Sequence, residues 1–144
     1  MTESGLADGV ARIVLDTNIV LDLLVFNDVA TPPLREALQA GRVQWVATAP
    51  MRDELERVLA YPQIAKRLAF YGLSAEQVLA ARDAQVQTVE VPPKASVTCK
   101  DPDDQKFIDL AVVQRCPVLS KDHAVLCMAK RLLALGAHAR AAIE

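Results

Sequence analysis

The chain has 144 residues, 52% of them hydrophobic, and 16 basic and 18 acidic residues give it a formal net charge of -2 at pH 7. This length fits one domain that buries roughly two-thirds of the surface of its unfolded chain, so folding needs neither a disulfide nor a structural metal. The charge does not fit the strongly basic class of dedicated nucleic-acid binders, and no apolar run approaches the ~20 residues that cross a bilayer.

The first residues differ in character from the rest. Residues 1–11 contain two acids and no base, and they lack the apolar core of a secretory signal. We therefore expect residues 1–11 to form a flexible tail and residues 12–144 to form the domain. The three cysteines show no paired or CxxC spacing: Cys99, Cys116 and Cys127. This usage indicates reduced thiols in a cytoplasmic protein and argues against zinc bound through sulfur.

The first predicted element is a strand at residues 12–16, where an apolar run stops at a carboxylate. The segment reads Arg12-Ile13-Val14-Leu15-Asp16-Thr17-Asn18. A continuous apolar run of this kind is typical of a parallel strand covered on both faces. Because open α/β sheets bind ligands outside the carboxyl ends of their strands, Asp16 is the first candidate functional residue.

Helices and strands alternate through the middle of the chain. In chain order we expect a helix at 32–40 ended by Gly41, a strand at 44–48, and a helix at 50–61 ended by Pro62. Two helices between residues 64 and 85 should break at Gly72, with Ser74 as N-cap of the second, before a strand at 87–91. Glycine supplies a left-handed C-cap, and proline disfavours the helical conformation of the residue before it.

The helix at residues 50–61 carries the second candidate, Glu54. Its apolar stripe includes Met51 and Val58, and Glu54 lies on the flank of that stripe at helical spacing. We therefore expect Glu54 to point inward. Its acidic neighbours are better explained as surface partners of arginines on the same helix, worth a few tenths of a kcal/mol.

An acidic segment at residues 100–108 opens the next helix. Asp103 is expected as the N-cap and Asp104 in the first turn, where both favour the helix dipole. Asp104 shares a face with Ile108, so it should point towards the sheet. Asp101 and Asp103 suit loop and cap roles.

The strand predicted at residues 116–120 repeats the logic of the first motif, because it gives way to Ser120 and then Asp122. A helix at 122–135 and a short edge strand at 137–143 complete the chain. Asp122 also suits an N-cap role. The order of all these elements predicts an α/β domain with a mainly parallel sheet.

Four acids thus occupy matching positions at the ends of buried elements: Asp16, Glu54, Asp104 and Asp122. Two like charges ~4 Å apart repel by about 4 kcal/mol at an effective dielectric of 20, so such a cluster needs protonation or a cation. Oxygen ligands favour Mg2+ or Mn2+. A metal so held can activate water for attack on a phosphodiester.

Four sequence blocks occur in a specific order and spacing: Leu15-Asp16-Thr17-Asn18-Ile19; Glu54-Leu55, then Val58-Leu59 and Tyr61-Pro62; Asp101-Pro102-Asp103-Asp104-Gln105-Lys106-Phe107; and Ser120-Lys121-Asp122. Together they resemble the PIN-domain nucleases over residues 12–126. The resemblance is to the bacterial members that act as toxins of toxin–antitoxin systems, the VapC-like proteins.

The resemblance implies a Rossmann-like three-layer α/β/α fold and an endoribonuclease that uses one or two Mg2+ or Mn2+ ions. It assigns metal binding and catalysis to four acids, with two supporting polar residues: Asp16, Glu54, Asp104 and Asp122, with Asn18 and Ser120. A protein antitoxin, a homodimer and an RNA substrate are the implied partners, and no membrane is. Lysines beside the acidic blocks are candidates for contacts with substrate phosphates: Lys100, Lys106 and Lys121.

The chain departs from the family at one position. Where many relatives carry a further acid, this chain has Ala124, preceded by His123. The departure leaves open a second interpretation, a non-catalytic module that binds metal or RNA. A third is a phosphatase of the haloacid-dehalogenase type with Asp16 as nucleophile, although Asn18 stands where its general acid would be.

Overall fold

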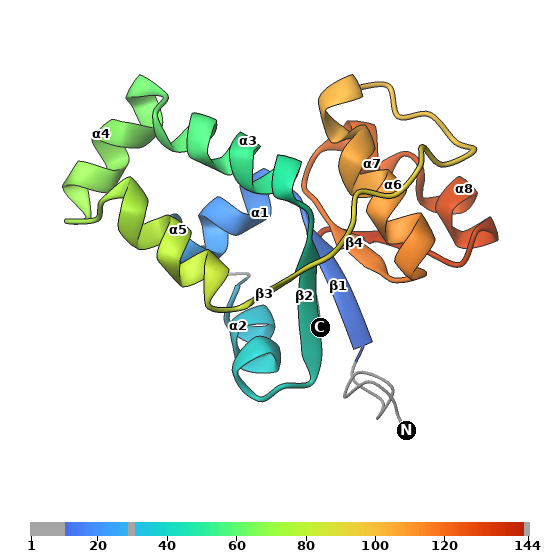
Figure 1. Cartoon of the computed structure of the whole chain (residues 1–144), viewed down its shortest axis with the longest axis horizontal. Coiled ribbons are helices and arrows are strands. Elements are labelled where there is room, and N and C mark those ends of the chain that lie inside the picture. Colours follow the sequence, from blue (N-terminus) through green and yellow to red (C-terminus); the bar gives the residue numbers. More distant parts are fainter. Residues whose placement is uncertain (1–10, 29–30, 143–144) are drawn as a thin grey trace.

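A parallel sheet forms the centre of the computed structural model, which describes residues 11–28 and 31–142. Its strands are β1 (Ala11–Leu15), β2 (Val43–Ala47), β3 (Val86–Thr88), β4 (Pro117–Leu119) and β5 (His138–Arg140). They lie in the order β3-β2-β1-β4-β5, and every neighbouring pair is parallel (Figure 1). The predicted α/β class with a parallel sheet is confirmed.

Helices cover both faces of this sheet. One group comprises α1 (Thr17–Leu21), the π-helix η2 (Asp22–Phe26), α2 (Pro32–Gln39), α3 (Ala49–Leu59), α4 (Pro62–Phe70) and α5 (Ala75–Asp83). The other comprises the 3-10 helix η3 (Pro102–Asp104), α6 (Gln105–Gln114), α7 (His123–Leu126) and α8 (Ala129–Ala134). Figure 1 shows the two groups on opposite sides of β1. The architecture is therefore a three-layer α/β/α fold.

Alternation along the central strand explains the two cores. Ile13 and Leu15 pack in one apolar cluster with residues of α1, α3 and α5, whereas Val14 packs in a second cluster with residues of α6 and α8. All three side chains are buried. A strand that contributes to two cores must be apolar at consecutive positions, which is the pattern seen in its sequence.

The glycine, serine and proline residues expected at helix ends act largely as predicted. Gly41 and Gly72 have φ values of 74° and 69°, in the left-handed region that favours glycine. Ser74 caps α5 and forms a reciprocal capping box with Gln77. α3 ends at Leu59, two residues before its predicted end, and Pro62 starts α4, where its missing N–H costs no hydrogen bond.

The single helix predicted at residues 122–135 is wrong. The chain forms α7 and α8 instead, and it leaves helical geometry at Met128, where φ is -91° and ψ is 5°. Val125, Met128 and Leu132 are all fully buried, so the apolar period continues across the break. Periodicity therefore could not reveal it.

The predicted tail, residues 1–11, lies outside the described residues except for Ala11, which pairs with Val43 in the sheet. The three cysteines are free thiols, and Cys127 is exposed. Among the helices described, none has the length and apolar character that crossing a bilayer requires.

Candidate metal centre

The candidate site lies where the order in which strands are added to the sheet reverses. From β1 at the centre, the chain adds β2 and then β3 towards one edge of the sheet. It then returns to the other side of β1 and adds β4 and β5 towards the opposite edge. The carboxyl ends of β1 and β4 are neighbours, because Leu15 pairs with Leu119. In open α/β sheets this switch point is where ligands bind, since the connections leave it uncovered.

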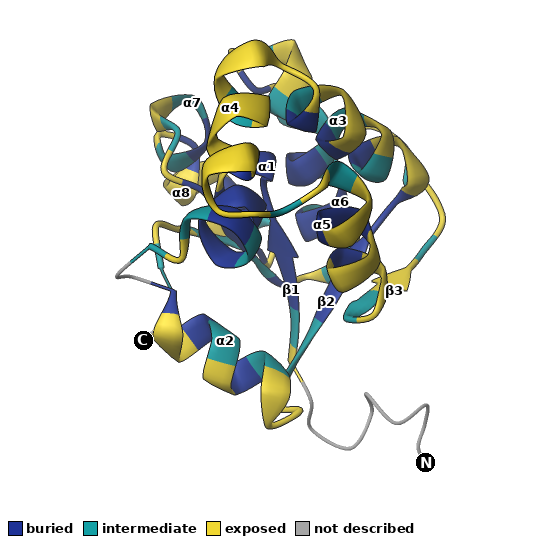
Figure 2. Ribbon diagram, turned by 90° about the vertical axis from the view of Figure 1, so that its left-hand side faces the viewer, coloured by how far each residue is buried: buried dark blue, intermediate teal, exposed yellow. Residues whose placement is uncertain are grey.

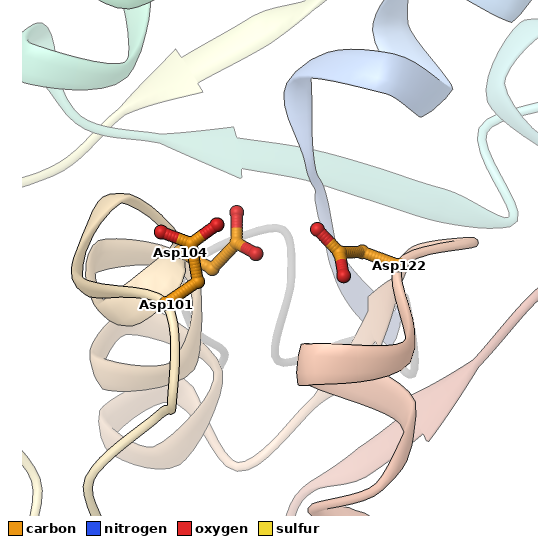
Figure 3. A group of neighbouring side chains, drawn as sticks. All are labelled: Asp101, Asp104 and Asp122. Carbon is orange, nitrogen blue, oxygen red and sulfur yellow. The ribbon is translucent and has the colours of Figure 1, made fainter.

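Three carboxylates meet there. One oxygen from each of Asp101, Asp104 and Asp122 lies within 4.8 Å of the other two, and all three residues are partly buried. Figure 3 shows Asp101 and Asp104 at the start of α6 facing Asp122 at the start of α7. The group thus joins the N-terminal ends of two helical segments of the second layer.

The loop before α6 differs from its predicted form. Asp101, not Asp103, is the cap, since its carboxylate accepts the backbone N–H of Asp103 at 3.0 Å and starts η3. The predicted N-cap role of Asp103 is wrong, and that side chain is exposed. A 3-10 turn between the cap and α6 shifts the cap position, and the same turn brings Asp101 beside Asp104.

Asp16 is held in place by backbone and hydroxyl donors. Its Oδ1 accepts the N–H of Ile19 at 3.0 Å, and its Oδ2 accepts the hydroxyl of Ser120. Ser120 is fully buried, and its Oγ also accepts the N–H of Asp122 at 2.9 Å. Asp122 in turn caps α7 by accepting the N–H of Ala124 at 2.9 Å. Ser120 therefore fixes the two strand-end acids relative to each other.

Glu54 points inward from α3, towards α1 and α6. Its carboxylate accepts the hydroxyl of Thr17 and forms an ion pair with Lys106 at 2.5 Å. The carboxylate is thus neutralised by a lysine and lies outside the three-carboxylate group. Thr17 stands in the first sequence block beside Asp16, a position that could have signalled its role.

The remaining predicted residues have different settings. Asn18 and Lys100 are exposed. Lys121 forms an ion pair with buried Asp22, which raises the pKa of the lysine, and lies 3.8 Å from Asp28. Sequence reasoning missed Asp22, because an acid within an apolar run shows no partner until the fold supplies one.

The local charges of the pocket are not balanced. Burial, followed by the proximity of Asp122, Asp101 and Asp16, raises the pKa of Asp104 to about 7. The pKa of Asp16 is also raised, chiefly by burial. Oδ2 of Asp104 is buried and has no hydrogen-bond donor among the described residues. An acceptor without a donor beside two further carboxylates suits a divalent cation with oxygen ligands.

This imbalance predicts a pH dependence of stability for the metal-free protein. The ordinary pKa of the Asp104 carboxyl is 3.8, and the folded state raises it to about 7. Between about pH 4 and pH 7 the folded state therefore holds a proton that the unfolded state has lost, so this group's contribution to the free energy of unfolding falls as pH rises. Urea denaturation in EDTA across this range should show wild type losing stability relative to Asp104→Asn. Parallel curves would contradict the assignment.

Comparisons with known proteins agree with this geometry. Residues 12–123 match a family model described as PIN domain. The match covers β1 to the start of α7, and so includes all four acids predicted for the site. No curated protein matches the chain.

Proposed function

We propose that this chain, which belongs to the PIN domain family, is an endoribonuclease that depends on Mg2+ or Mn2+. PIN domains are generally metal-dependent nucleases, and the chain has an acidic cluster suited to such an ion. The observation that carries the proposal is the buried Oδ2 of Asp104, which has no donor within the described residues and faces other carboxylates.

The donor set fits a hard divalent cation. Asp104 and Asp122 would hold it together with Asp101, which belongs to the same group. Asp16 is linked to Asp122 through Ser120, and Glu54 is linked to α6 through Lys106. A bound Mg2+ or Mn2+ supplies activation of water and stabilisation of the charge that develops on the phosphate. The chain's own contribution is positioning, since fixed ligands lose little freedom when the ion binds.

Two hydrogen bonds of Ser120 and one ion pair provide that positioning. Ser120 bonds to both strand-end acids, and Lys106 holds Glu54. In the proposed reaction, Lys106 exchanges this carboxylate for a substrate phosphate, a change available to a side chain that is one-quarter exposed. Lys100 and Lys121 are proposed as further phosphate contacts, consistent with their exposure at the ends of the acidic loops.

The phosphatase interpretation loses support from the surroundings of Asp16. A nucleophilic aspartate needs an oxygen that can reach the substrate. Asp16 is only 3% exposed, and each of its oxygens already accepts a hydrogen bond. This setting suits a residue that orients the pocket or binds a metal.

The test is single-turnover cleavage of a mixed-sequence RNA by the purified protein. We expect cleavage with Mn2+ or Mg2+ and none in EDTA, and we expect the matched DNA to be cut more slowly. Metal binding measured by calorimetry without cleavage of any RNA would instead support a non-catalytic module and would point to Ala124, where many relatives carry an acid.

We also propose that the protein is a toxin restrained by a protein antitoxin and that it forms a homodimer. The four motif blocks support this role through their resemblance to such toxins. Growth arrest when the chain is expressed alone, relieved by loss of the acidic pocket, is the expected outcome. Unchanged growth, together with cleavage in vitro, would remove the toxin role and leave the nuclease.

A further inference from the structure

Helix α4 presents an exposed surface of aromatic and basic side chains, distant in sequence from the acidic loops. Figure 2 shows the helix almost entirely exposed. Its buried residue is Leu68. Phe70 is 83% exposed and Tyr71, the C-cap residue, is 43% exposed. Large apolar rings left in water indicate a surface that contacts another molecule.

The surface is hollowed. A depression of about 730 Å3 is lined by Pro62, Gln63, Lys66, Arg67, Phe70 and Tyr71. Its volume lies within the range of about 300–1,000 Å3 typical of ligand sites. The two rings meet edge to face, with centroids 5.3 Å apart and planes at 77°. The open Phe70 ring is therefore available for stacking.

The charge of the surface selects the kind of partner. α4 contains Lys66 and Arg67 and no acid, although the whole chain has a net charge of -2. The Arg67 guanidinium lies 4.2 Å from the centroid of the Phe26 ring and donates to the Tyr71 hydroxyl at 3.4 Å. Neither Lys66 nor Arg67 forms an ion pair within the described residues.

These charges favour a polyanion over a second copy of the chain. A symmetric contact would bring the Lys66 and Arg67 side chains of two copies together, and like charges across an interface are unfavourable. Exposed aromatic rings beside unpaired lysine and arginine side chains are instead typical of surfaces that bind single-stranded nucleic acid without sequence preference. The nucleobases stack on the rings, and the basic side chains contact the phosphates.

We propose that the α4 surface binds single-stranded RNA as an extension of the substrate path, an inference that rests on the proposed nuclease function. Bases stack on Phe70 and Tyr71, while Lys66 and Arg67 contact the backbone. α3 leads from the end of β2 to α4, and its 11 residues span about 16 Å. Single-strand sites cover about 4–16 nucleotides, and the proposed path follows α3 from the end of β2 to α4.

The experiment measures binding separately from cleavage. A labelled single-stranded RNA of about 16 nucleotides is titrated with the full chain in EDTA, and Kd is read by fluorescence anisotropy. Phe70→Ala should weaken binding about tenfold, as expected for the loss of one stacked base. Lys66→Ala should reduce the slope of log Kd against the logarithm of the salt concentration by about one. Matched controls on α8, Leu133→Ala and Lys130→Ala, remove an exposed apolar and an exposed basic side chain, and neither should change Kd.

Equal affinity of wild type and Phe70→Ala would overturn the inference. The inference would also be overturned if Phe70→Ala changed the oligomeric mass measured by sedimentation but left the RNA affinity unchanged. That outcome would assign the surface to contact with a second copy of the chain. Cleavage is assayed in parallel with Mn2+. If Phe70→Ala weakens RNA binding but the wild type cleaves no RNA, this inference stands and the proposed nuclease function is contradicted. If the wild type cleaves RNA but Phe70→Ala binds it as tightly as the wild type does, the nuclease function stands and this inference is contradicted.

Discussion

Replacing Asp104 with asparagine is expected to abolish metal-dependent cleavage and, at the same time, to stabilise the metal-free protein above about pH 7. The substitution keeps the shape of the side chain and removes a charge whose pKa burial and neighbouring acids raise to about 7. The new amide can donate to Asp122. Loss of a metal ligand should cost more than the loss of one of its outer-shell partners, which lowers activity by about 10–100-fold.

Asp103→Asn is the matched control, because it makes the same chemical change one residue away at an exposed side chain. It should retain cleavage and metal binding. The measurements are single-turnover rates with Mn2+, calorimetric metal binding and thermal melting in EDTA. An Asp104→Asn protein that cleaves RNA at the wild-type rate would remove Asp104 from the active centre. A stabilised but inactive variant would exclude misfolding as the cause of the loss.

The largest effect on stability is expected from Phe107→Ala. Phe107 is 1% exposed and belongs to the core cluster beneath the second helix layer, three residues after Asp104, the last residue of η3. Truncation of a buried phenylalanine removes apolar contacts and leaves a cavity, at a cost of about 3–5 kcal/mol. The melting temperature should fall by about 10 °C.

Val113→Ala provides the comparison on the same helix, because Val113 is 53% exposed. It should change the free energy of unfolding by no more than about 0.5 kcal/mol. Urea denaturation of both variants measures the difference. A cost below about 1 kcal/mol for Phe107→Ala would show that the side chains around it close the cavity.

The positions of the strands and of several helix ends were predictable because their signals are local, although β3 ends at Thr88 and not at residue 91, and no element was predicted where α1 and η2 lie. An apolar run that ends at Asp16, and glycines at positions 41 and 72 that adopt positive φ, each determine structure within a few residues. The break before α8 was not predictable, since the chain changes its backbone at Met128 without interrupting the buried face. Periodicity reports which side chains are buried and says less about the turns between them.

The site shows the same division between local and distant information. Positions at strand ends were enough to nominate Asp16 and Asp122, because topology brings strand ends together. The partners of Glu54 and the approach of Asp101 to Asp104 depend on side chains supplied by other elements. These contacts decide which acids remain uncompensated. The charge balance of each acid depends on which side chains lie near it in space, and the spacing of residues along the sequence does not give those positions.

The hydrogen bond from Ser120 to Asp16 joins residues 104 positions apart. During synthesis at about 5–20 residues per second, the second partner emerges about 5–20 s after the first. Throughout that interval β1 lacks its neighbour β4, and the acids that follow the two strands are not yet held together. The proposed ribonuclease would therefore acquire its pocket late in its own translation. Its messenger and the ribosome that reads it would be exposed to an incomplete, inactive chain until the pocket closes.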